Sequence, residues 1–391
     1  MKKLPWIAIS LLLLSYSPTL QASDDHNLCL FDPPPYQNVS IPADDALHLE
    51  PDGTYTHQYE QWYWTAFVNG RHGKTYALQT LVFQFNLFQP LIFDIVQISY
   101  TDIETGDHYT DFALNFDAPG YTPVTNGFDI ELHDPVTGAG LVAIGGGGRD
   151  SLTFNFSDGT VAEIHMNSLK HPTESLDGLK DYLDTVTGES HGEQYYLNRR
   201  SMATRGKITF PGERPIRVSG IGHYDRQWGT VIGTPGTQAD NVSWKWFALT
   251  LFDGTHAPTQ GVLPAFATNY VMWDMHANDT GNTLVHRIDK IGPAPLCRQE
   301  HIDNWTVEGT GETIFSPGPP PTTIDLVNTI SIPSEGLELT VEPLVDDQFV
   351  NSGGLFDPFY EGITKVTGTR HGRPVSGYGY YEGFLSCCQG Q

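Results

Sequence analysis

The sequence predicts an all-β protein with frequent turns. Glycine and proline occur 40 and 27 times in 391 residues, and aromatic side chains make up 12% of the chain. Long stretches of Ala, Leu, Glu and Lys at helical spacing are scarce, so helices should be few and short. Short apolar runs alternate with turn signals such as Asn69-Gly70 and Asn126-Gly127, which is the pattern of a meander or a barrel.

A first series of expected strands is separated by turn signals such as Thr105-Gly106-Asp107 and Ser157-Asp158-Gly159. Its members are Gln61 to Val68, Tyr76 to Asn86, Asp94 to Thr101, His108 to Phe116, Gly127 to Leu132, Leu141 to Ala143, Ser151 to Phe156 and Thr160 to Met166. The Gly145 to Gly148 run predicts a flexible hairpin tip rather than a phosphate-binding loop, because no helical pattern with a Lys follows it.

A second series of expected strands begins near Trp244. Its members are Trp244 to Phe252, Asn269 to Met275, Leu284 to Ile291, Trp305 to Gly309, Asp325 to Ser331, Leu337 to Glu342, Tyr360 to Gly368 and Gly377 to Leu385. Gly233 to Asp240 is rich in small and polar residues and predicts a connector, and the Pro-rich Ser316 to Pro321 predicts a stiff surface loop. About 370 mature residues exceed what one core usually holds. We therefore expect two β domains, 23–235 and 236–391.

Residues 1–22 predict a secretory signal peptide. A basic start, Met1-Lys2-Lys3, precedes a Leu-rich apolar run, and the small residue Ala22 stands before Ser23. No later segment approaches the roughly 20 apolar residues of a spanning helix. The residues before Cys29 lack the small side chains of a lipoprotein site, so lipidation is not expected. The mature chain should be exported, periplasmic or secreted, without stable membrane insertion.

Charge and cysteine content limit the partners and the compartment. The net charge is −25, from 46 acidic and 21 basic residues, which argues against nucleic acid or an anionic membrane surface as partner. Four cysteines in an oxidising compartment allow two disulfides. Adjacent Cys387 and Cys388 rarely bond to each other, so we expect them to pair elsewhere, with Cys29 and Cys297 as candidates. No Cys-x-x-Cys or Cys/His spacing suggests a zinc site, and we expect no metal or cofactor.

The segment Gly220 to Gly229 concentrates chemically active side chains between glycines: His223, Tyr224, Asp225, Arg226, Gln227 and Trp228. In an extended backbone alternate side chains share a face, so His223, Asp225 and Gln227 should point away from the other three. If Asp225 faces an apolar cavity, burial raises its pKa and a neighbouring imidazole opposes that rise, which is how acid catalysts are tuned. The alternative is an ion pair that closes one end of a barrel, with Trp228 as a core plug.

A second candidate strand places Glu60, Trp62 and Trp64 on one face. Two indoles beside one carboxylate are typical of a hydrophobic pocket whose aromatic faces stabilise a cation. The alternative is a barrel floor of packed aromatics with a structural Glu. Trp244 and Trp246 repeat the spacing in the second half of the chain.

Two further carboxylates, Glu361 and Glu382, stand beside tyrosines, and such groups in strands more often cap or pair than react. Hydrolysis is less well supported, because the chain has no Gly-x-Ser-x-Gly elbow. Retaining glycosidase carboxylates stay open, since their pairing is spatial, but an aromatic cleft more naturally takes an apolar ligand.

Taken in order, several segments resemble one family. They are Glu60 to Trp64, Tyr195-Tyr196, Arg205-Gly206, Gly220 to Gly229, Tyr360-Glu361-Gly362, Val366-Thr367-Gly368, Gly372 to Val375 and Gly377 to Glu382. The set is similar to the lipocalin-like family that includes bacterial carotenoid 1,2-hydratases, secreted AttH-type proteins, fungal kievitone hydratase and fungal Diels-Alderases. The resemblance implies two lipocalin-like barrels side by side, with a hydrophobic pocket associated with the first barrel and its contact with the second.

The resemblance also implies a role for Asp225, which stands where the carotenoid hydratases have an aspartate thought to protonate a C=C bond before water captures the cation. This chain departs from those enzymes in three places. His223 replaces a Tyr, Tyr196-Leu197-Asn198 stands where they have a His-x-Trp pair, and Gln61 replaces a Trp. These departures argue against carotenoid hydration itself and for a pocket of different shape.

These observations predict an exported enzyme that acts on a hydrophobic isoprenoid or polyketide-like small molecule, as a hydratase (hydro-lyase) or an isomerase/cyclase. The expected catalytic residues are Asp225, His223 and Tyr224, and the expected substrate-binding residues are Glu60, Trp62, Trp64, Tyr196, Trp228 and Trp246. Two alternatives remain: a carrier that holds a hydrophobic molecule without turnover, and a purely structural motif that fastens the two barrels together.

Overall fold

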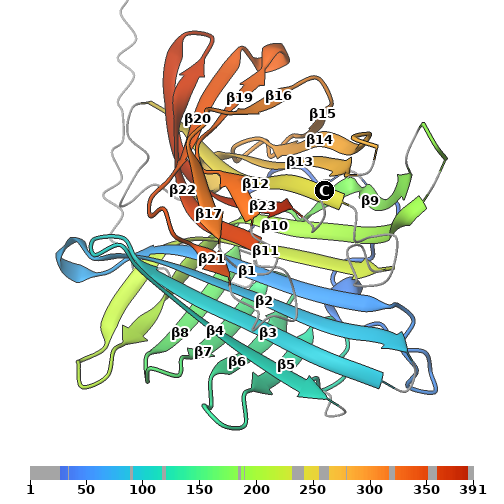
Figure 1. The fold of residues 1–391 in the computed structure, drawn as a ribbon, viewed down its shortest axis with the longest axis vertical. Coiled ribbons are helices and arrows are strands. Elements are labelled where there is room, and N and C mark those ends of the chain that lie inside the picture. The colour runs from blue at the N-terminus through green and yellow to red at the C-terminus, as the bar shows by residue number, and fades with distance from the viewer. Residues whose placement is uncertain are drawn as a thin grey trace, which may run out of the picture.

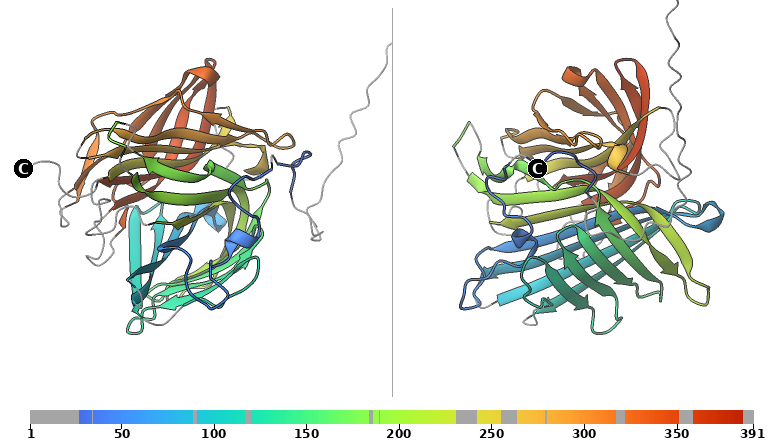
Figure 2. Two further views of the ribbon diagram at one scale, coloured as in Figure 1. Left: turned by 90° about the vertical axis from the view of Figure 1, so that its right-hand side faces the viewer. Right: turned by 180° about the vertical axis from the view of Figure 1, so that it is seen from behind.

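The structure of the protein is a computed structural model, and it describes residues 27–33, 35–88, 91–116, 120–183, 186–188, 190–230, 242–254, 264–278, 280–316, 322–350 and 359–385. The fold is all-β, as expected, and its strands form two large antiparallel sheets, each curled into a barrel-like shape. Figure 1 shows the first sheet, coloured blue to yellow-green, below the second, coloured yellow to red. The two further views in Figure 2 give the same arrangement.

The first sheet has 11 strands in the order β4-β3-β2-β1-β11-β10-β8-β7-β6-β5, with β9 paired to β10. The strands are β1 (Tyr59–Asn69), β2 (Thr75–Phe88), β3 (Leu91–Asp102), β4 (Asp107–Phe116), β5 (Phe128–His133), β6 (Gly140–Gly146), β7 (Arg149–Asn155), β8 (Val161–Ser168), β9 (Thr173–Leu183), β10 (Ser190–Thr209) and β11 (Ile216–Gly229). The first and last strands, β1 and β11, pair along the whole length of β1, and the edge strands β4 and β5 approach each other to close the curve.

The second sheet has 10 strands and repeats this plan, since its first strand β12 pairs with its last strand β23. Its order is β15-β14-β13-β12-β23-β22-β20-β19-β16, with β21 paired to β22, and β17 and β18 form a separate hairpin. The strands are β12 (Val242–Asp253), β13 (Thr268–Ala277), β14 (Thr283–Ile291), β15 (Gln299–Ile302), β16 (Thr306–Gly309), β17 (Thr313–Ser316), β18 (Thr322–Asp325), β19 (Asn328–Ile332), β20 (Leu337–Pro343), β21 (Phe349–Val350), β22 (Phe359–Arg370) and β23 (Arg373–Leu385).

Helical structure in the described residues is limited to single 3-10 turns: η1 (Ala43–Asp45), η2 (Arg71–Gly73), η4 (Pro264–Phe266) and η5 (Pro333–Glu335). None of the helices in the described part of the chain has the length and apolar character needed to cross a membrane.

Three apolar clusters organise the core. One fills the interior of the first barrel and includes Trp62 and Trp64, and another fills the second barrel around Phe247 and Leu249. The third lies between the two sheets and contains residues of both, such as Tyr63 from the first sheet and Trp246 from the second. Because strand side chains alternate, each of β1 and β12 contributes one face to its own barrel and the other to the contact between sheets. We call this contact the seam.

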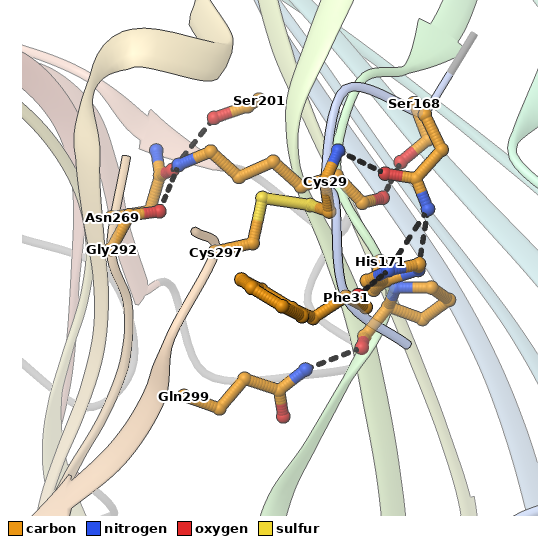
Figure 3. Close-up of a disulfide and its surroundings, with 12 residues drawn as sticks. Cys29, Phe31, Ser168, His171, Ser201, Asn269, Gly292, Cys297 and Gln299 are labelled. Atoms are coloured by element: carbon orange, nitrogen blue, oxygen red, sulfur yellow. Dashed lines mark hydrogen bonds between the residues drawn. A yellow bond between two sulfur atoms is a disulfide. The ribbon is translucent and has the colours of Figure 1, made fainter. Parts of the chain in front are cut away.

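A disulfide also joins the two halves, as Figure 3 shows. Cys29, in the segment before the first sheet, is bonded to Cys297, which lies between β14 and β15. The expectation that these cysteines pair with Cys387 and Cys388 is therefore wrong, because the fold brings the start of the chain against the second sheet rather than against the chain end. Cys387 and Cys388 lie outside the described residues.

The strands expected from sequence are largely confirmed, and Gly145 to Gly148 is the hairpin tip between β6 and β7, with positive φ at Gly146, Gly147 and Gly148. The strands β9 and β10 and the short strands β15, β17, β18 and β21 were not foreseen. The predicted signal peptide at 1–22, the connector at 233–240 and most of the 316–321 loop lie outside the described residues. Sheet membership changes between β11 and β12, that is, between Gly229 and Val242.

Candidate functional site

The seam contains a level rich in carboxyl groups, which we call the carboxyl layer: Tyr63, Asp225, Trp246, Glu361 and Glu382. Strand register brings these side chains together. Tyr63 lies opposite Asp225 in the β1–β11 pair, and Glu382 lies opposite both Trp246 and Glu361 in the second sheet. The hydroxyl of Tyr63 then donates a hydrogen bond across the seam to Oε2 of Glu361, at 2.8 Å. Each sheet therefore supplies carboxyl groups to the same buried level.

Asp225 is the buried acid of the first sheet, with a residue exposure of 1%. The hydroxyl of Tyr196 donates to its Oδ2 at 2.7 Å, and Nε2 of Gln227 lies 3.3 and 3.4 Å from its two oxygens. Tyr196 in turn accepts a hydrogen bond of 3.1 Å from the indole nitrogen of Trp246, on the second sheet. The Asp225 side chain is thus oriented by two neutral hydrogen-bond donors of the first sheet, and Trp246 of the second sheet holds one of them, Tyr196, in place.

The arginines near Asp225 are engaged elsewhere. Arg199 forms an ion pair with Asp45, with 2.6 Å between the charged atoms. Arg200 donates to Asn198, to Ser175 and to the backbone oxygen of Asp289, on the second sheet. Among the described residues, Asp225 therefore has no ion-pair partner that would hold a buried carboxyl in its charged form.

Burial is the main reason why the pKa of Asp225 is raised to about 8. The hydrogen bonds from Tyr196 and Gln227 oppose this rise, the charge of Glu382 adds to it, and the charge of Arg200 slightly opposes it. At neutral pH the carboxyl group therefore carries its proton, which is the form that an acid catalyst needs.

His223 lies one step along the same face of β11 and is neutral near pH 7. Burial, helped by the charge of Arg200, lowers the pKa of its imidazole to about 3. Its Nε2 is buried and has no hydrogen-bond partner among the residues that the structure describes. The ring stands edge-on to Trp246, with 5.7 Å between centroids.

A small hollow borders His223. It has a volume of about 30 Å³, which is enough for one water molecule. It lies one register step from the carboxyl layer, where Thr65 is opposite His223 and Tyr380 is opposite both Ala248 and Ile363. A buried unpartnered nitrogen beside a space of this size indicates a site for a small polar molecule.

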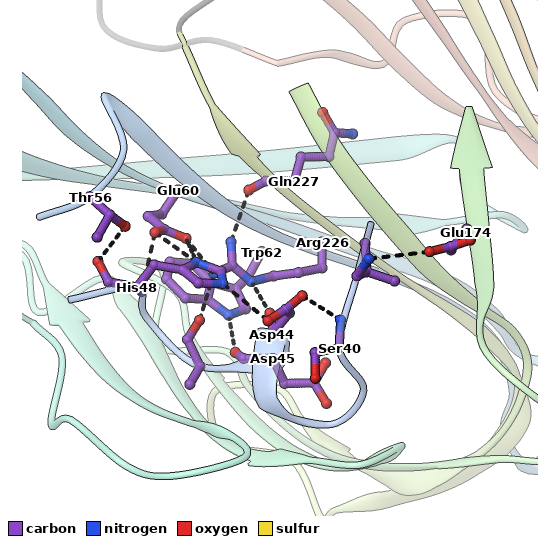
Figure 4. A network of polar contacts seen from close by, with 12 residues as sticks. Ser40, Asp44, Asp45, His48, Thr56, Glu60, Trp62, Glu174, Arg226 and Gln227 are labelled. Carbon is purple, nitrogen blue, oxygen red and sulfur yellow. Dashed lines mark hydrogen bonds and ion pairs between the residues drawn. The ribbon is translucent and has the colours of Figure 1, made fainter. Parts of the chain in front are cut away.

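The opposite face of β11 serves the inside of the first barrel. Arg226 forms a buried ion pair with Glu60 and stacks on the ring of Trp62, with 4.0 Å from guanidinium carbon to centroid, as Figure 4 shows. His48 lies beside this pair, and its Nδ1 is 3.0 Å from Oε1 of Glu60. Burial is the largest single influence and raises the pKa of Glu60, but the charges and hydrogen bonds of Arg226 and His48 together outweigh it and hold that pKa below its usual value.

Tyr224, Trp64 and Trp228 belong to the same interior. The hydroxyl of Tyr224 donates to Asp45 at 3.2 Å, and the indole of Trp64 donates to Asp150 at 3.1 Å. All three rings are part of the apolar cluster of the first barrel. These contacts satisfy the polar atoms of the two side chains without any ligand.

The structure thus brings together four of the residues expected from sequence and separates five from them. Asp225, His223, Tyr196 and Trp246 meet in the seam. Tyr224, Glu60, Trp62, Trp64 and Trp228 point into the first barrel. The cause is strand alternation, since Tyr224 and Trp228 have the opposite phase to Asp225 on β11, and Trp62 and Trp64 have the opposite phase to Tyr63 on β1.

Sequence reasoning gave no role to Tyr63, Glu361 and Glu382. The two glutamates are 21 positions apart in the printed sequence and meet only because β22 and β23 form a hairpin in this register. The usable signal was the pair of Tyr-Glu-Gly triplets, Tyr360-Glu361-Gly362 and Tyr381-Glu382-Gly383, on consecutive expected strands. A hairpin between those strands places the two carboxyl groups opposite each other.

No group of three or more His, Cys, Asp or Glu side chains within the described ranges is arranged so that it could hold a metal ion.

The fold and the site define a class: an all-β protein of two curled antiparallel sheets with a protonated carboxyl group buried where they meet. Residues 32–258, more than half of the chain, match the family model described as AttH-like. The chain therefore belongs to the AttH-like family.

Named relatives agree with this assignment. The chain is 22% identical to kievitone hydratase of Fusarium solani subsp. phaseoli over 329 residues, covering 82% of this chain and 81% of that protein. A crystal structure of a putative AttH from Nitrosomonas europaea matches with a TM-score of 0.68 at 19% identity, covering 92% of this chain and all of that one. Kievitone hydratase from Nectria haematococca matches with a TM-score of 0.62 at 15% identity, covering 90% and 97%. At these identities the solved structures establish the shared fold.

Proposed function

We propose that this AttH-like protein is an enzyme of the hydro-lyase or isomerase/cyclase type, acting on a hydrophobic unsaturated small molecule of isoprenoid or polyketide character. The observation that carries the proposal is Asp225, a carboxyl group with a pKa of about 8 that is buried between two sheets and oriented by Tyr196. The name of the fungal relative, kievitone hydratase, supports a hydration reaction as the first to test.

The proposed chemistry begins with proton transfer from Asp225 to one carbon of a C=C bond. The positive charge that forms on the other carbon is stabilised by the faces of Trp246 and Tyr63. Water then adds to that carbon in a hydration, a neighbouring proton leaves in an isomerisation, or an internal double bond adds in a cyclisation. Asp225 is the acid, Tyr196 and Trp246 position it, and neutral His223 is a hydrogen-bonding partner for water or substrate.

In this proposal Tyr224, Glu60, Trp62, Trp64 and Trp228 are structural, because their polar atoms are satisfied inside the first barrel. We also propose that the chain is exported after removal of 1–22, and that its domains are 23–235 and 236–391. The disulfide between Cys29 and Cys297 supports export, because such bonds persist in oxidising compartments.

The test compares the full mature chain with its Asp225→Asn variant, using kievitone and a panel of prenylated and polyene compounds, with product formation and ligand binding measured separately. Asn preserves shape but has no acidic proton, so turnover should fall by about 10²-fold or more while ligand affinity changes little. Asp107→Asn, at an exposed position, is the matched control.

Unchanged turnover in Asp225→Asn would overturn the proposal. Binding of several panel compounds without any product would instead support the carrier role, in which the seam only holds its ligand.

A further inference from the structure

The strongest unexplained feature of the seam is the contact between Glu361 and Glu382. They are direct partners in the β22–β23 ladder, so their side chains leave the sheet on the same face and at the same level. Glu361 is 3% exposed, and its Oε1 has no hydrogen-bond donor among the described residues. Glu382 is half-buried. Two carboxylates that are direct cross-strand partners repel each other unless one of them carries a proton.

Within the described ranges, the groups that interact with the pair are neutral or acidic. They are Tyr63 from β1, Asp225 from β11, Trp244 and Trp246 from β12, and Tyr380 from β23. The nearby cation Lys245 is bound to Asp325 at 2.8 Å and to Asn328. A proton shared between the two glutamates would remove their repulsion, and burial followed by the charge of Glu382 raises the pKa of Glu361.

The two members of the pair are not equivalent. Oε2 of Glu361 accepts from the hydroxyl of Tyr63, and an oxygen of Glu382 accepts from the indole nitrogen of Trp244. One oxygen of each glutamate is thus held by a neutral donor, and the second oxygen of Glu361 has no hydrogen-bond partner among the described residues. The unpartnered Nε2 of His223 and the hollow beside it, one register step away, supply a place for a water molecule at the same seam.

We propose that Glu361 and Glu382 act as a one-proton pair that accepts a proton opposite the acid Asp225, so that the seam carries a proton donor on one sheet and a proton acceptor on the other. This inference rests on the proposed function and assigns the group that accepts the proton in the proposed reaction. It selects proton-transfer reactions, hydration or double-bond isomerisation, over a pericyclic cyclisation, which needs no acceptor.

The steps balance for a hydration. Asp225 gives its proton to one alkene carbon and becomes a carboxylate, and the oxygen of a water molecule bonds to the other carbon. That oxygen then loses a proton to the pair, which holds two protons until one returns to Asp225. The net change is the addition of H and OH across the double bond, with no oxidant or reductant.

The test is infrared difference spectroscopy of the full mature chain at neutral pH, comparing it with the Glu361→Gln/Glu382→Gln double variant. The double variant should lose one protonated-carboxyl C=O band and one carboxylate band. Each single variant keeps one member and should lose only one of the two signals. Glu342→Gln removes an exposed carboxylate paired with Lys365 and is the control. Loss of two carboxylate bands, or of two protonated-carboxyl bands, would overturn the pair.

Turnover tests the acceptor role, with the same panel as above. Glu361→Gln should lower turnover by about 10²- to 10⁴-fold. Full turnover in both single variants would refute the role even if the shared proton is present. These results are separate from those of Asp225→Asn, since an ionised Asp225 ends the proposed function whatever the state of the glutamates.

Discussion

At the scale of single residues, the account depends on how each buried charge is compensated. Two carboxyl groups on neighbouring strands differ completely in this respect. Glu60 is paired with Arg226 and stays charged, whereas Asp225 is held by Tyr196 and Gln227 and keeps its proton. The contrast arises because β11 directs its arginine into the barrel and its aspartate into the seam.

The proton on Asp225 predicts a specific dependence of stability on pH. Its pKa of about 8 in the folded protein lies above the roughly 3.9 of an unfolded aspartate. Between these values the folded state binds more protons, so the contribution of Asp225 to the free energy of unfolding falls as the pH rises. The Asp225→Asn variant has no ionisable group at this position, so this part of the pH dependence of the free energy of unfolding should be absent from it.

Urea unfolding of the wild type and the Asp225→Asn variant, repeated across that pH range, measures the effect. As the pH rises toward 8, the free energy of unfolding of the wild type should fall relative to that of Asp225→Asn. The Asp107→Asn control should show the same pH dependence as the wild type. Parallel stability curves for wild type and Asp225→Asn would contradict the assignment.

The buried pair in the first barrel predicts a loss of stability rather than of binding. Glu60→Gln leaves the guanidinium of Arg226 without its countercharge, and the free energy of unfolding should fall by about 3–5 kcal/mol. Glu163→Gln breaks an exposed pair with Lys207 and should cost about 1 kcal/mol or less. Denaturant melts of both variants make the comparison. If Glu60→Gln leaves the free energy of unfolding unchanged and alters ligand affinity instead, Glu60 belongs to the binding site.

At the scale of strands, phase decides what the sequence can and cannot reveal. The same Trp-x-Trp spacing occurs on β1 and β12, yet Trp62 and Trp64 enter their own barrel while Trp244 and Trp246 face the seam. Local sequence gives the alternation but not which face is turned inward, because both faces of these central strands are buried. The strands themselves were predictable from turn signals, and the alternation of His223 and Asp225 against Tyr224 and Trp228 is confirmed.

Other elements were missed because the apolar pattern alone does not describe them. The strand β10 contains buried polar residues such as Arg199 and Arg200, whose partners include residues far away in the chain. Its pairing with β11 is interrupted between Arg199 and Met202, and Ser201 has a positive φ. Side-chain partners far away in the chain, such as Asp45 and Asp289, leave no local mark in the sequence.

Lys170, in the link between β8 and β9, should contribute strongly to the stability of the contact between the two sheets. Nζ of Lys170 donates to the backbone oxygens of Ala267 and Gly292, at 2.6 and 2.9 Å, and to Oδ1 of Asn269 at 2.7 Å. Lys170→Met removes the lysine donor from the two buried backbone oxygens, at about 1–3 kcal/mol each, while Oδ1 of Asn269 keeps its hydrogen bond from Ser201. The melting temperature should fall clearly.

The exposed Lys207→Met, which makes the same chemical change, should alter the melting temperature little, and thermal melts followed by circular dichroism compare the two. Equal melting temperatures for wild type and Lys170→Met would show that the hydrogen bonds of Lys170 contribute nothing to the contact between the sheets.

At the scale of the whole molecule, the site exists only because two sheets of similar plan meet. Asp225 comes from one sheet and the glutamate pair from the other, and Tyr63 and Trp246 each reach across the gap to the opposite sheet. The two-barrel plan could be predicted from the family resemblance. The composition of the seam could not, since it depends on how the sheets are rotated against each other.

The central claim is that Asp225 holds a proton at neutral pH inside this seam. Carbon-13 NMR of aspartate-labelled protein measures it most directly, with the signal of Asp225 assigned by its absence in Asp225→Asn. The account predicts a carboxyl carbon that titrates near pH 8 and is protonated at pH 7. A resonance that is fully ionised by about pH 5, as for an ordinary aspartate, would contradict it.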